Sequence, residues 1–360
     1  MGPWETPPGK FWAVADQNPL QVMPSMADDL ARVETQLMES VRSGDDFLTE
    51  ISSHLIAAGG KRVRPGFCLA SAATALAVDA PASAEAVTGG VAVELVHLGS
   101  LYHDDVMDEA VMRRTVDSVN ARWGNLKAIL AGDFLLARAS ELAAGLGVEV
   151  AGLLAATIGR LCEGQVLELR HAFDTGRTED SYLRSIDGKT ASLLASSCRI
   201  GGIVAELPRA HTDALTEFGS SYGMAFQLVD DVLDLVATEA YLGKPAGHDL
   251  EEGVYTLPVI HTLAGARGAE LRSLLGRSDG IEGNGIEGNG TDGVRIEPVD
   301  RDRAIEIVRD GDGIGVTIAR ARAYADRGRA ALTQLPDSPG VVGLSAAADY
   351  LLDNVEAAAA

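Results

Sequence analysis

Cysteine is scarce in this chain, and its scarcity excludes two kinds of site. The sequence has three cysteines, Cys68, Cys162 and Cys198, and no two of them have the CxxC spacing that is typical of zinc and thiol redox sites. Three scattered cysteines also do not match the disulfide framework of a small secreted domain. The pattern indicates buried thiols in a reducing compartment, so we expect a cytoplasmic protein.

Long apolar runs are lacking as well. The N-terminal segment has no apolar stretch of signal-peptide length, and no segment reaches the roughly 18 uninterrupted apolar residues that a membrane span needs. We therefore expect no transmembrane segment.

Positive charge is also sparse. Lysine and arginine total 30 against 52 aspartates and glutamates, which gives a net charge of -22 at pH 7. Such an acidic chain lacks the basic face that nucleic-acid binding needs, so we expect no nucleic-acid partner. Five lysines occur, at Lys10, Lys61, Lys127, Lys189 and Lys244. Four of them, Lys10, Lys61, Lys189 and Lys244, stand beside glycine, where the backbone can approach an anion closely.

The apolar residues that are present follow helical spacing. Hydrophobic residues make up 46% of the chain, which is ample for a large core. Helical patterns begin at about residue 27, and long ones follow at 83–108, 148–173, 179–202, 210–237, 255–275 and 302–334. No alternating runs bounded by turn signals indicate a sheet. We predict an all-α fold, a single large antiparallel helical bundle around a central cavity.

Two segments do not follow this pattern. Residues 1–27 are rich in proline and have no clear period, which predicts a flexible N-terminal extension before an all-α domain at 28–360. Residues 278–300 repeat IEGNG at 281–285 and 286–290. Because glycine and asparagine do not hold a helix, we expect a flexible insert there.

Two aspartate clusters with the same spacing lie inside long apolar runs. They are Asp104, Asp105 and Asp108 in HDDVMD, and Asp230, Asp231 and Asp234 in VDDVLD. Residues four apart share one face of a helix, so the first and last aspartate of each cluster project together. Two such clusters would repel each other unless cations lay between them. Carboxylate oxygens in this arrangement suit Mg²⁺, which substrate phosphate oxygens commonly complete.

A separate set of cations surrounds the first cluster in the sequence. Lys61 and Arg64 are three residues apart in GGKRVRP, so both can reach one anion, whereas Arg62 points elsewhere. Arg113 and Arg114 follow the first cluster, and on a helix adjacent residues diverge by about 100°, which suits two different anions. His97 lies seven residues before Asp104, on the same helical face. One diphosphate bound through metal and a second bound by cations describe a transferase with a diphosphate leaving group.

These segments resemble the trans-isoprenyl diphosphate synthases, the polyprenyl synthetase family. The matching pieces occur in family order over about residues 30–350: GGKRVRP, HDDVMD with the following RR, Lys189–Thr190, FQLVDDVLD and GKPAGHDLEEGVYTLP. The resemblance implies the isoprenoid synthase type of bundle. It also implies that an allylic diphosphate loses pyrophosphate, that the double bond of isopentenyl diphosphate attacks the resulting cation, and that a proton is then lost.

The resemblance also implies roles for individual residues. About three Mg²⁺ would be held by Asp104, Asp105, Asp108 and Asp230, with Asp231 and Asp234 in the outer shell. The allylic diphosphate would contact Arg113, Lys189 and Lys244, and isopentenyl diphosphate would contact Lys61, Arg64, His97 and Arg114. Thr190 and Gln227 would lie near the reacting carbons, and Gln165 would line the cavity. Thr115 and Asp117 depart from the commoner family pattern, which leaves the turn after Arg114 open.

The residues before Asp104 bear on product length. Short-chain members of the family have an aromatic residue four or five positions before the first motif. This chain has Ser100 and Gly99 at those positions, and Val96 lies one turn before Ser100. Each helical turn spans about 5.4 Å, comparable to one isoprene unit. We expect a polyprenyl diphosphate of C30 to C50, unless Gly99 serves close helix packing or another helix forms the floor.

Other functions are less consistent with the motifs. A geranylgeranyl or farnesyl diphosphate synthase of the same family is the first alternative. A class I terpene cyclase would need a different second metal motif and no GGKRVRP site. A partner subunit of a heteromeric synthase would usually lack one aspartate cluster, and both are present. The family leads us to expect a homodimer, with peripheral membrane contact for product release.

Overall fold

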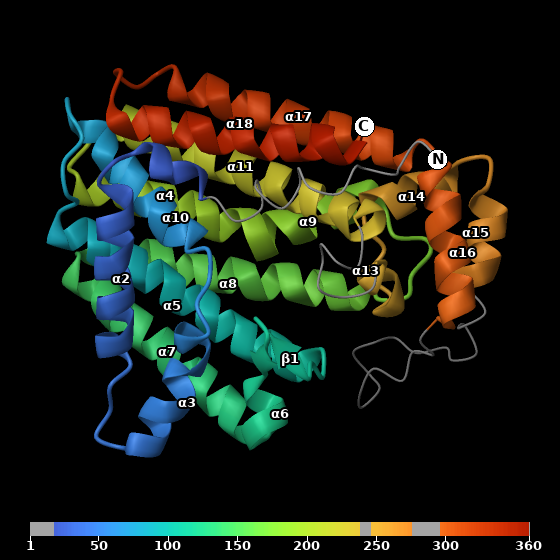
Figure 1. The fold of residues 1–360 in the computed structure, drawn as a ribbon, viewed down its shortest axis with the longest axis horizontal. Coiled ribbons are helices and arrows are strands. Elements are labelled where there is room, and N and C mark those ends of the chain that lie inside the picture. Colours follow the sequence, from blue (N-terminus) through green and yellow to red (C-terminus); the bar gives the residue numbers. More distant parts are fainter. Residues whose placement is uncertain (1–17, 238–245, 276–295, 360) are drawn as a thin grey trace.

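The fold was analysed in a computed structural model that describes residues 18–237, 246–275 and 296–359, with side chains up to residue 353. The first half of the bundle consists of α2 (Met26–Ser40), α3 (Asp46–Ala57), α4 (Val63–Ala72), α5 (Ala84–Met107), α6 (Val119–Trp123), α7 (Asn125–Gly145) and α8 (Val148–Arg170). The second half consists of α9 (Glu179–Ile186), α10 (Ser192–Val204), α11 (Arg209–Val236), α13 (His248–Glu251), α14 (Leu257–Ala264), α15 (Gly268–Leu275), α16 (Pro298–Arg309), α17 (Gly313–Leu332) and α18 (Pro339–Ala359). The prediction of an all-α bundle is confirmed (Figure 1).

The long helices lie side by side as layers of one bundle. In Figure 1, α18 and α17 lie along one side, α11 and α10 follow, and α8, α5 and α7 complete the other side. The helix α10 is buried along most of its length and contacts α4, α5, α8 and α11. An aromatic cluster of Phe67, Phe218 and Tyr222 lies between α4 and α11, with the Phe67 and Tyr222 rings edge to face at 4.6 Å. The core therefore surrounds α10, and the helix ends that carry the motifs emerge from it.

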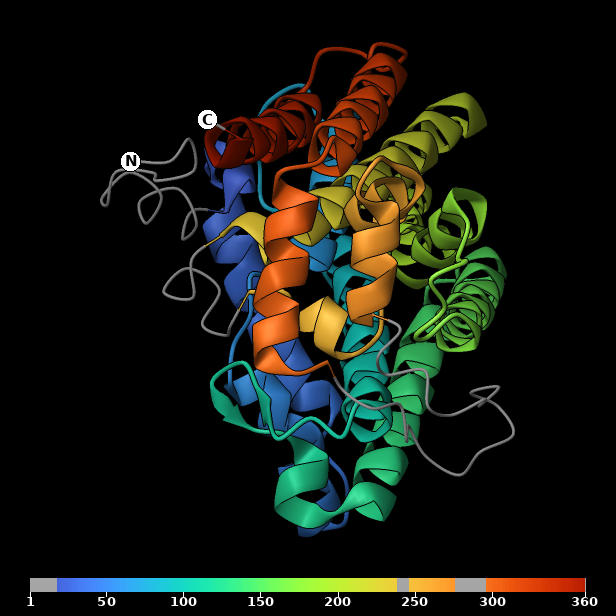
Figure 2. The ribbon, with the colours of Figure 1, turned by 90° about the vertical axis from the view of Figure 1, so that its right-hand side faces the viewer.

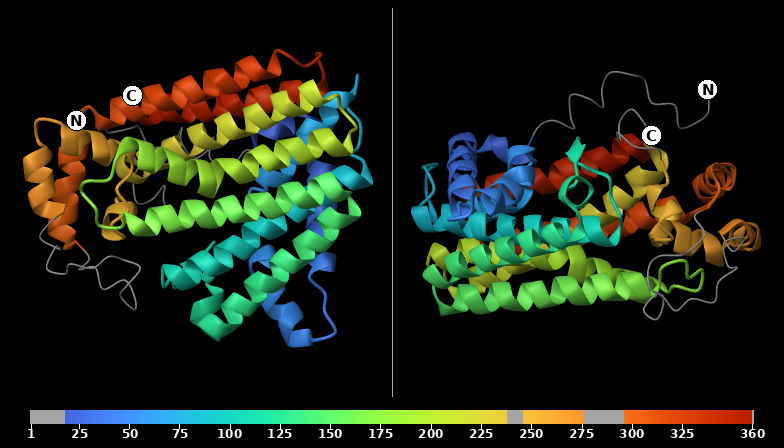
Figure 3. Two further views of the ribbon diagram at one scale, coloured as in Figure 1. Left: turned by 180° about the vertical axis from the view of Figure 1, so that it is seen from behind. Right: turned by 90° about the horizontal axis from the view of Figure 1, so that it is seen from below.

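Shorter helices close the two ends of the bundle. The helices α2 and α3 cross the long helices at one end, and α15 and α16 pack against each other at the opposite end (Figures 1 and 2). Seen from behind, α8 (green) faces the viewer across the middle of the bundle, and α17 and α18 (red) lie along its upper edge (Figure 3, left). Among the described residues, the β-structure is one hairpin of β1 (Met112–Arg113) and β2 (Val116–Asp117).

The predicted N-terminal boundary is wrong for the part of the extension that the structure describes. Residues Pro19–Val22 form a 3-10 turn that packs on α18, and Leu20, Met23 and Met26 are buried. The Asn18 side chain accepts a hydrogen bond from the Leu20 N–H at 3.0 Å, which caps the turn. Proline therefore begins a turn here, and its apolar neighbours join the core. Residues 1–17 lie outside the described structure.

Two predicted helical segments are divided. The pattern at 302–334 forms α16 and α17, with Gly311 between them, and the pattern at 255–275 forms α14 and α15 around Gly265. The IEGNG repeat lies outside the described residues, and the end of the predicted insert is helical because α16 begins at Pro298. Proline suits this position because the first turn of a helix needs no donor from its backbone nitrogen.

One helix, α8, is long and apolar enough to cross a membrane by length and composition, with a mean hydropathy of 1.3 over its most apolar window. In this fold α8 contacts α7, α9 and α10 within the bundle. Only 28% of that window is buried, so one side of α8 has no cover from the described part of the chain.

Candidate active site

The first aspartate cluster lies at the C-terminal end of α5. The helix ends at Met107, and the N–H of Asp108 donates to the carbonyl of Asp104 at 2.8 Å, so these two carboxylates are one turn apart as the spacing predicts. Asp105 is fully buried, and its Oδ1 accepts a hydrogen bond from Arg113 Nε at 2.7 Å. Its Oδ2 is buried and has no hydrogen-bond partner. The cluster therefore has oxygen atoms available to a ligand.

The arginine pair lies on the β1–β2 hairpin, so the helical angle assumed between its two side chains does not apply. Arg114 and Thr115 form its two-residue loop with φ of 51° and 66°, the backbone of a type I′ turn. Arg113 pairs with Asp105, whereas Arg114 donates to the carbonyl of Leu55 at 3.1 Å and to that of Gly59. The two guanidinium groups thus point to different partners because Arg113 lies in a strand and Arg114 in the hairpin loop.

The second cluster lies near the C-terminal end of α11. Asp231 is buried, and its two oxygens accept hydrogen bonds from the Tyr182 hydroxyl and from Gln227 Nε2. Burial raises the pKa of Asp231, against the effect of these two donors. Asp234 is also buried and accepts from the N–H of Asp249 at 3.3 Å, whereas Asp230 is exposed. Asp230 is therefore the member of this cluster that faces outward from the core.

A π-helical turn at Asp187–Ala191 joins α9 to α10 and carries Lys189 and Thr190. Sequence periodicity predicted one continuous helix here, but a π turn inserts an extra residue and is frequent at functional sites. A Cβ added at Gly164 of α8 would lie 2.5 Å from the backbone nitrogen of Lys189, so only glycine lets α8 approach the π-helical turn this closely. One turn further along α8, Glu168 Oε1 accepts a hydrogen bond from Lys189 Nζ at 2.5 Å.

Electrostatic effects show that the two clusters face a common space. Burial raises the pKa of Asp104. The positive charges of Lys189 and Arg113 lower this pKa, and the negative charge of Glu168 raises it. The same glutamate also raises the pKa of Asp231. Although burial opposes the change, Glu168 and Asp104 raise the pKa of Lys189. Lys189 therefore remains charged among carboxylates from α5 and α8.

The π-helical turn at Asp187–Ala191 also begins a chain of hydrogen bonds to α11. Thr190 Oγ1 donates to Gln227 Oε1 at 2.9 Å, and Gln227 Nε2 donates to Asp231 Oδ1 at 3.0 Å. Gln165, on α8, is half-buried, and its Oε1 makes no hydrogen bond in the described structure. The predicted pair Thr190 and Gln227 is thus in direct contact. Lys244 lies outside the described residues.

The cationic set gathers around His97, about two turns before Asp104 along α5. Arg64 Nε is buried and has no hydrogen-bond acceptor among the described residues. His97 is half-buried, and burial together with the charges of Arg64 and Arg114 lowers its pKa well below the ordinary value. A neutral imidazole near a half-buried guanidinium whose Nε has no acceptor among the described residues is a site that an anion would complete. Lys61 is exposed on the preceding loop.

Gly99 lies at a close helix contact, the alternative that its spacing left open. A Cβ at Gly99 would lie 3.1 Å from the carbonyl oxygen of Gly132 and 3.1 Å from Leu136 Cγ, both on α7. Gly99 therefore faces the α5–α7 contact. Val96 and Ser100 lie on the same face of α5 as Asp104, Val96 fully buried and Ser100 half-buried. Of the three predicted positions, Ser100 alone is both on this face and accessible.

The carboxylates suit a hard divalent cation. They offer oxygen ligands, and Asp105 has a buried oxygen without a partner. In the described part of the chain, no three Asp, Glu, His or Cys side chains are already arranged around a single ion position. Mg²⁺ usually takes one or two carboxylates and completes its shell with water and substrate phosphate.

Sequence reasoning missed three charged or polar residues that shape the site: Glu94, Glu168 and Tyr182. Glu168 lies three residues after Gln165, and Glu94 lies three before His97, each on the same helical face as its neighbour. A carboxylate one turn from a polar residue in an apolar helix is the signal that could have identified both. Tyr182 offered no such signal because its partner, Asp231, is distant in sequence.

Comparison with known proteins identifies the family. The family model for polyprenyl synthetase matches residues 45–283. This chain belongs to the polyprenyl synthetase family. Nonaprenyl diphosphate synthase of Mycobacterium tuberculosis is 38% identical over 327 residues, which cover 89% of this chain and 91% of that protein.

Solved structures of the same family have the same fold. The crystal structure of a decaprenyl diphosphate synthase from Rhodobacter capsulatus matches 93% of this chain and 98% of its own, with a TM-score of 0.82 and 34% identity. A geranylgeranyl pyrophosphate synthase from Corynebacterium glutamicum, solved with calcium and isoprenyl diphosphate, covers the same shares with a TM-score of 0.77 and 36% identity. Similar family members are thus named for products of different length.

Proposed function

We propose that this chain is a trans-prenyltransferase that condenses isopentenyl diphosphate with an allylic diphosphate and releases pyrophosphate. The observation that carries the proposal is a pair of unlike, neighbouring anion sites along α5. One consists of the carboxylates of α5 and α11 with Lys189 and Arg113. The other consists of Arg64, whose buried Nε has no acceptor among the described residues, with His97 and Arg114. Two diphosphates could bind side by side, one with metal and one without.

The residues of the first site suit an allylic diphosphate. Bound Mg²⁺, about three ions, would neutralise the negative charge that develops on the departing pyrophosphate. Arg113 and Lys189, together with Lys244, would bind its oxygens, while Asp104, Asp105, Asp108 and Asp230 would hold the ions. Asp231 and Asp234 are engaged by protein donors, which suits the outer shell.

The reaction then needs a stabilised cation and a base. As the allylic C–O bond breaks, its electron pair leaves with pyrophosphate. Because Thr190 donates its hydroxyl proton to Gln227, its oxygen lone pairs are left to face the allylic cation. The double bond of isopentenyl diphosphate, held by Lys61, Arg64, His97 and Arg114, attacks this cation. We assign the proton that is then lost to the released pyrophosphate, whose oxygens lie next to the new carbocation.

We propose a product of C30 to C50. Ser100 is small and half-buried one turn below Asp104, and Val96 follows on the same face, so no aromatic side chain of α5 closes the space. The test is to incubate the purified chain with farnesyl diphosphate and labelled isopentenyl diphosphate and to separate the products by length. Termination at C15 or C20 would favour the geranylgeranyl or farnesyl synthase alternative.

Replacing Ser100 by phenylalanine is expected to shorten the product to C20 or below. An aromatic ring there would fill the turn, about 5.4 Å deep, below Asp104. The measurement is the product distribution of Ser100→Phe beside Ser273→Phe, a control on the exposed surface of α15. Unchanged product length in Ser100→Phe would place the floor of the pocket on another helix.

The alternative functions differ from this proposal in specific features. A class I terpene cyclase has no second diphosphate to bind, so it would leave the Arg64 and His97 site without a purpose. A partner subunit of a heteromeric synthase would show no activity alone. Activity of the purified single chain with both substrates separates these alternatives from the proposal.

We also propose that the chain forms a homodimer in the cytoplasm. The apolar residues Leu126, Ile129 and Leu130 are exposed at helical spacing on α7, and α8 is mostly uncovered on one side. Exposed apolar surface of this kind marks association sites. Sedimentation of the purified chain tests this proposal. A long polyprenyl product is insoluble in water, so its release would need peripheral contact with a membrane.

A further inference from the structure

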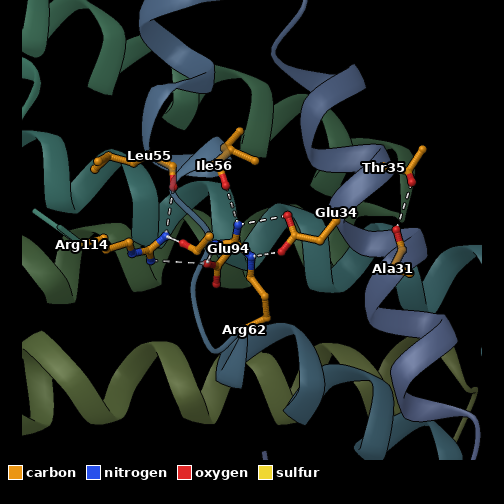
Figure 4. A network of polar contacts seen from close by, with 9 residues as sticks. Ala31, Glu34, Thr35, Leu55, Ile56, Arg62, Glu94 and Arg114 are labelled. Atoms are coloured by element: carbon orange, nitrogen blue, oxygen red, sulfur yellow. Dashed lines mark hydrogen bonds and ion pairs between the residues drawn. The ribbon is translucent and has the colours of Figure 1, made fainter. Parts of the chain in front are cut away.

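Glu94 is a buried carboxylate in the middle of α5 that the proposed mechanism does not use. Its exposed fraction is 2%, and its Oε1 lies 2.8 Å from Arg62 Nη1 and 3.9 Å from Arg114 Nη2 (Figure 4). A single buried oxygen is therefore shared by two guanidinium groups from different segments. A buried carboxylate is retained only where it is paired in this way.

Arg62 is fixed by acceptors on three elements. Its Nε and Nη2 bind the two oxygens of Glu34 on α2 at 2.5 and 3.0 Å, and Nη2 also donates to the carbonyl of Ile56 on α3 at 3.1 Å. Its backbone has a left-handed φ of 48° at the N-cap of α4. Lys61 precedes Arg62, and Arg64 follows within the first turn of α4. Fixing Arg62 therefore fixes the backbone that carries both predicted anion-binding side chains.

Arg114 meets Arg62 across Gly60. A Cβ at Gly60 would lie 2.9 Å from Arg114 Nη1 and 3.0 Å from Arg62 Nη1, so the two guanidinium groups enclose this glycine. Arg114 also donates to the carbonyls of Leu55 and Gly59 (Figure 4). Arg64 is also close enough for the charge of Arg114 to lower its pKa. Three arginines therefore lie close together, and like charges repel in a poorly solvated site.

Glu94 supplies the charge that offsets this repulsion. Burial lowers the pKa of both Arg64 and Arg114, and the charge of Glu94 is the main effect that opposes it. Glu34 does not substitute for it, because its side chain is 40% exposed and its hydrogen bonds go to Arg62.

We propose that Glu94 is the positioning residue of the metal-free diphosphate site: its charge, 3.9 Å away, pairs with Arg114, and its hydrogen bond to Arg62 holds the Lys61–Arg64 segment. The proposal rests on the proposed function, because it assigns Glu94 to the isopentenyl diphosphate side of the reaction. Glu94 does not touch substrate. It fixes the geometry of the cations that do.

The test is steady-state kinetics of Glu94→Gln with each substrate varied in turn. Loss of the shared carboxylate should misplace Arg114 and Lys61 together, so the KM for isopentenyl diphosphate should rise about tenfold or more. The KM for the allylic diphosphate should change by less than about twofold, because Lys189 and Arg113 have other partners. Glu34→Gln is the matched control: it removes a partner of Arg62 and leaves Glu94 in place, and both KM values should stay within about twofold.

Three results would overturn the proposal: an unchanged KM for isopentenyl diphosphate in Glu94→Gln, an equal rise in both KM values, or the same change in Glu34→Gln. If Glu94→Gln does not fold, the double variant Arg62→Gln with Glu94→Gln removes both charges of the pair and is less disruptive than leaving one buried charge alone. It should still raise the KM for isopentenyl diphosphate selectively, and a normal value would contradict the proposal. Failure of the wild-type chain to consume both diphosphates would instead contradict the proposed function.

Discussion

Replacing Asp104 by asparagine is expected to lower kcat about a thousandfold while leaving the fold intact. Asp104 projects from the last turn of α5 into the space that it shares with Lys189 and Glu168, and an amide there loses the charge that a hard cation needs. Without that ligand, the charge that develops on the departing pyrophosphate would be poorly neutralised. The measurement is kcat at saturating Mg²⁺ and substrate, with helicity checked by circular dichroism.

Asp349→Asn is the control for this change. Asp349 is exposed on α18, where it pairs with Arg329 on α17, far from α5 in sequence. This variant should retain wild-type kcat. If Asp104→Asn retained more than about a tenth of wild-type kcat, the first cluster would not be the metal site on which the mechanism depends.

Replacing Lys189 by glutamine is expected to lower kcat about a hundredfold and to raise the KM for the allylic diphosphate. Lys189 is the cation of the π-helical turn, and its ammonium lies 2.5 Å from Glu168 Oε1. Removing its charge leaves Glu168 and Asp104 without their shared counter-charge, and removes a donor to the diphosphate. Initial rates with each substrate varied in turn measure the effect.

Lys189→Arg separates charge from packing in this prediction. The arginine keeps the positive charge and should recover part of the lost kcat, whereas a defect in the π-helical turn would not be rescued by charge. A higher KM for isopentenyl diphosphate, with that for the allylic substrate unchanged, would contradict the assignment of Lys189 to the metal-bound diphosphate.

The sequence predicted those parts of the site that depend on local helical geometry. The pairs Asp104 with Asp108 and Asp230 with Asp234 share faces because α5 and α11 are regular through the motifs. Motif order and family resemblance placed Thr190 and Gln227 in one region and grouped Arg64 with His97 and Arg114, whereas the hydrogen bond between Thr190 and Gln227 came only from the structure. Their functional roles stay predictions until the variants are measured.

Other features depend on tertiary packing that spacing does not reveal. Gly99 faces α7 because Gly132 and Leu136 lie against it, a contact that no count along α5 could show. The β1–β2 hairpin forms with Arg114 and Thr115 at positive φ, where a sequence rule would ask for glycine or asparagine. The buried pairs of Glu94 and Glu168 join helices that are distant in the chain. A buried ion pair between distant segments thus cannot be recognised from the sequence before both partners are known.

The most direct test of the account is calorimetric binding of each diphosphate with and without metal. The account predicts that isopentenyl diphosphate binds with similar affinity in EDTA and in Mg²⁺, because Arg64, His97 and Arg114 hold it without an ion. An unreactive thiolodiphosphate analogue of the allylic substrate should bind in Mg²⁺ and lose at least about a hundredfold in affinity in EDTA. Loss of isopentenyl diphosphate binding in EDTA, or undiminished binding of the allylic analogue there, would contradict the division of the two diphosphates between the two sites.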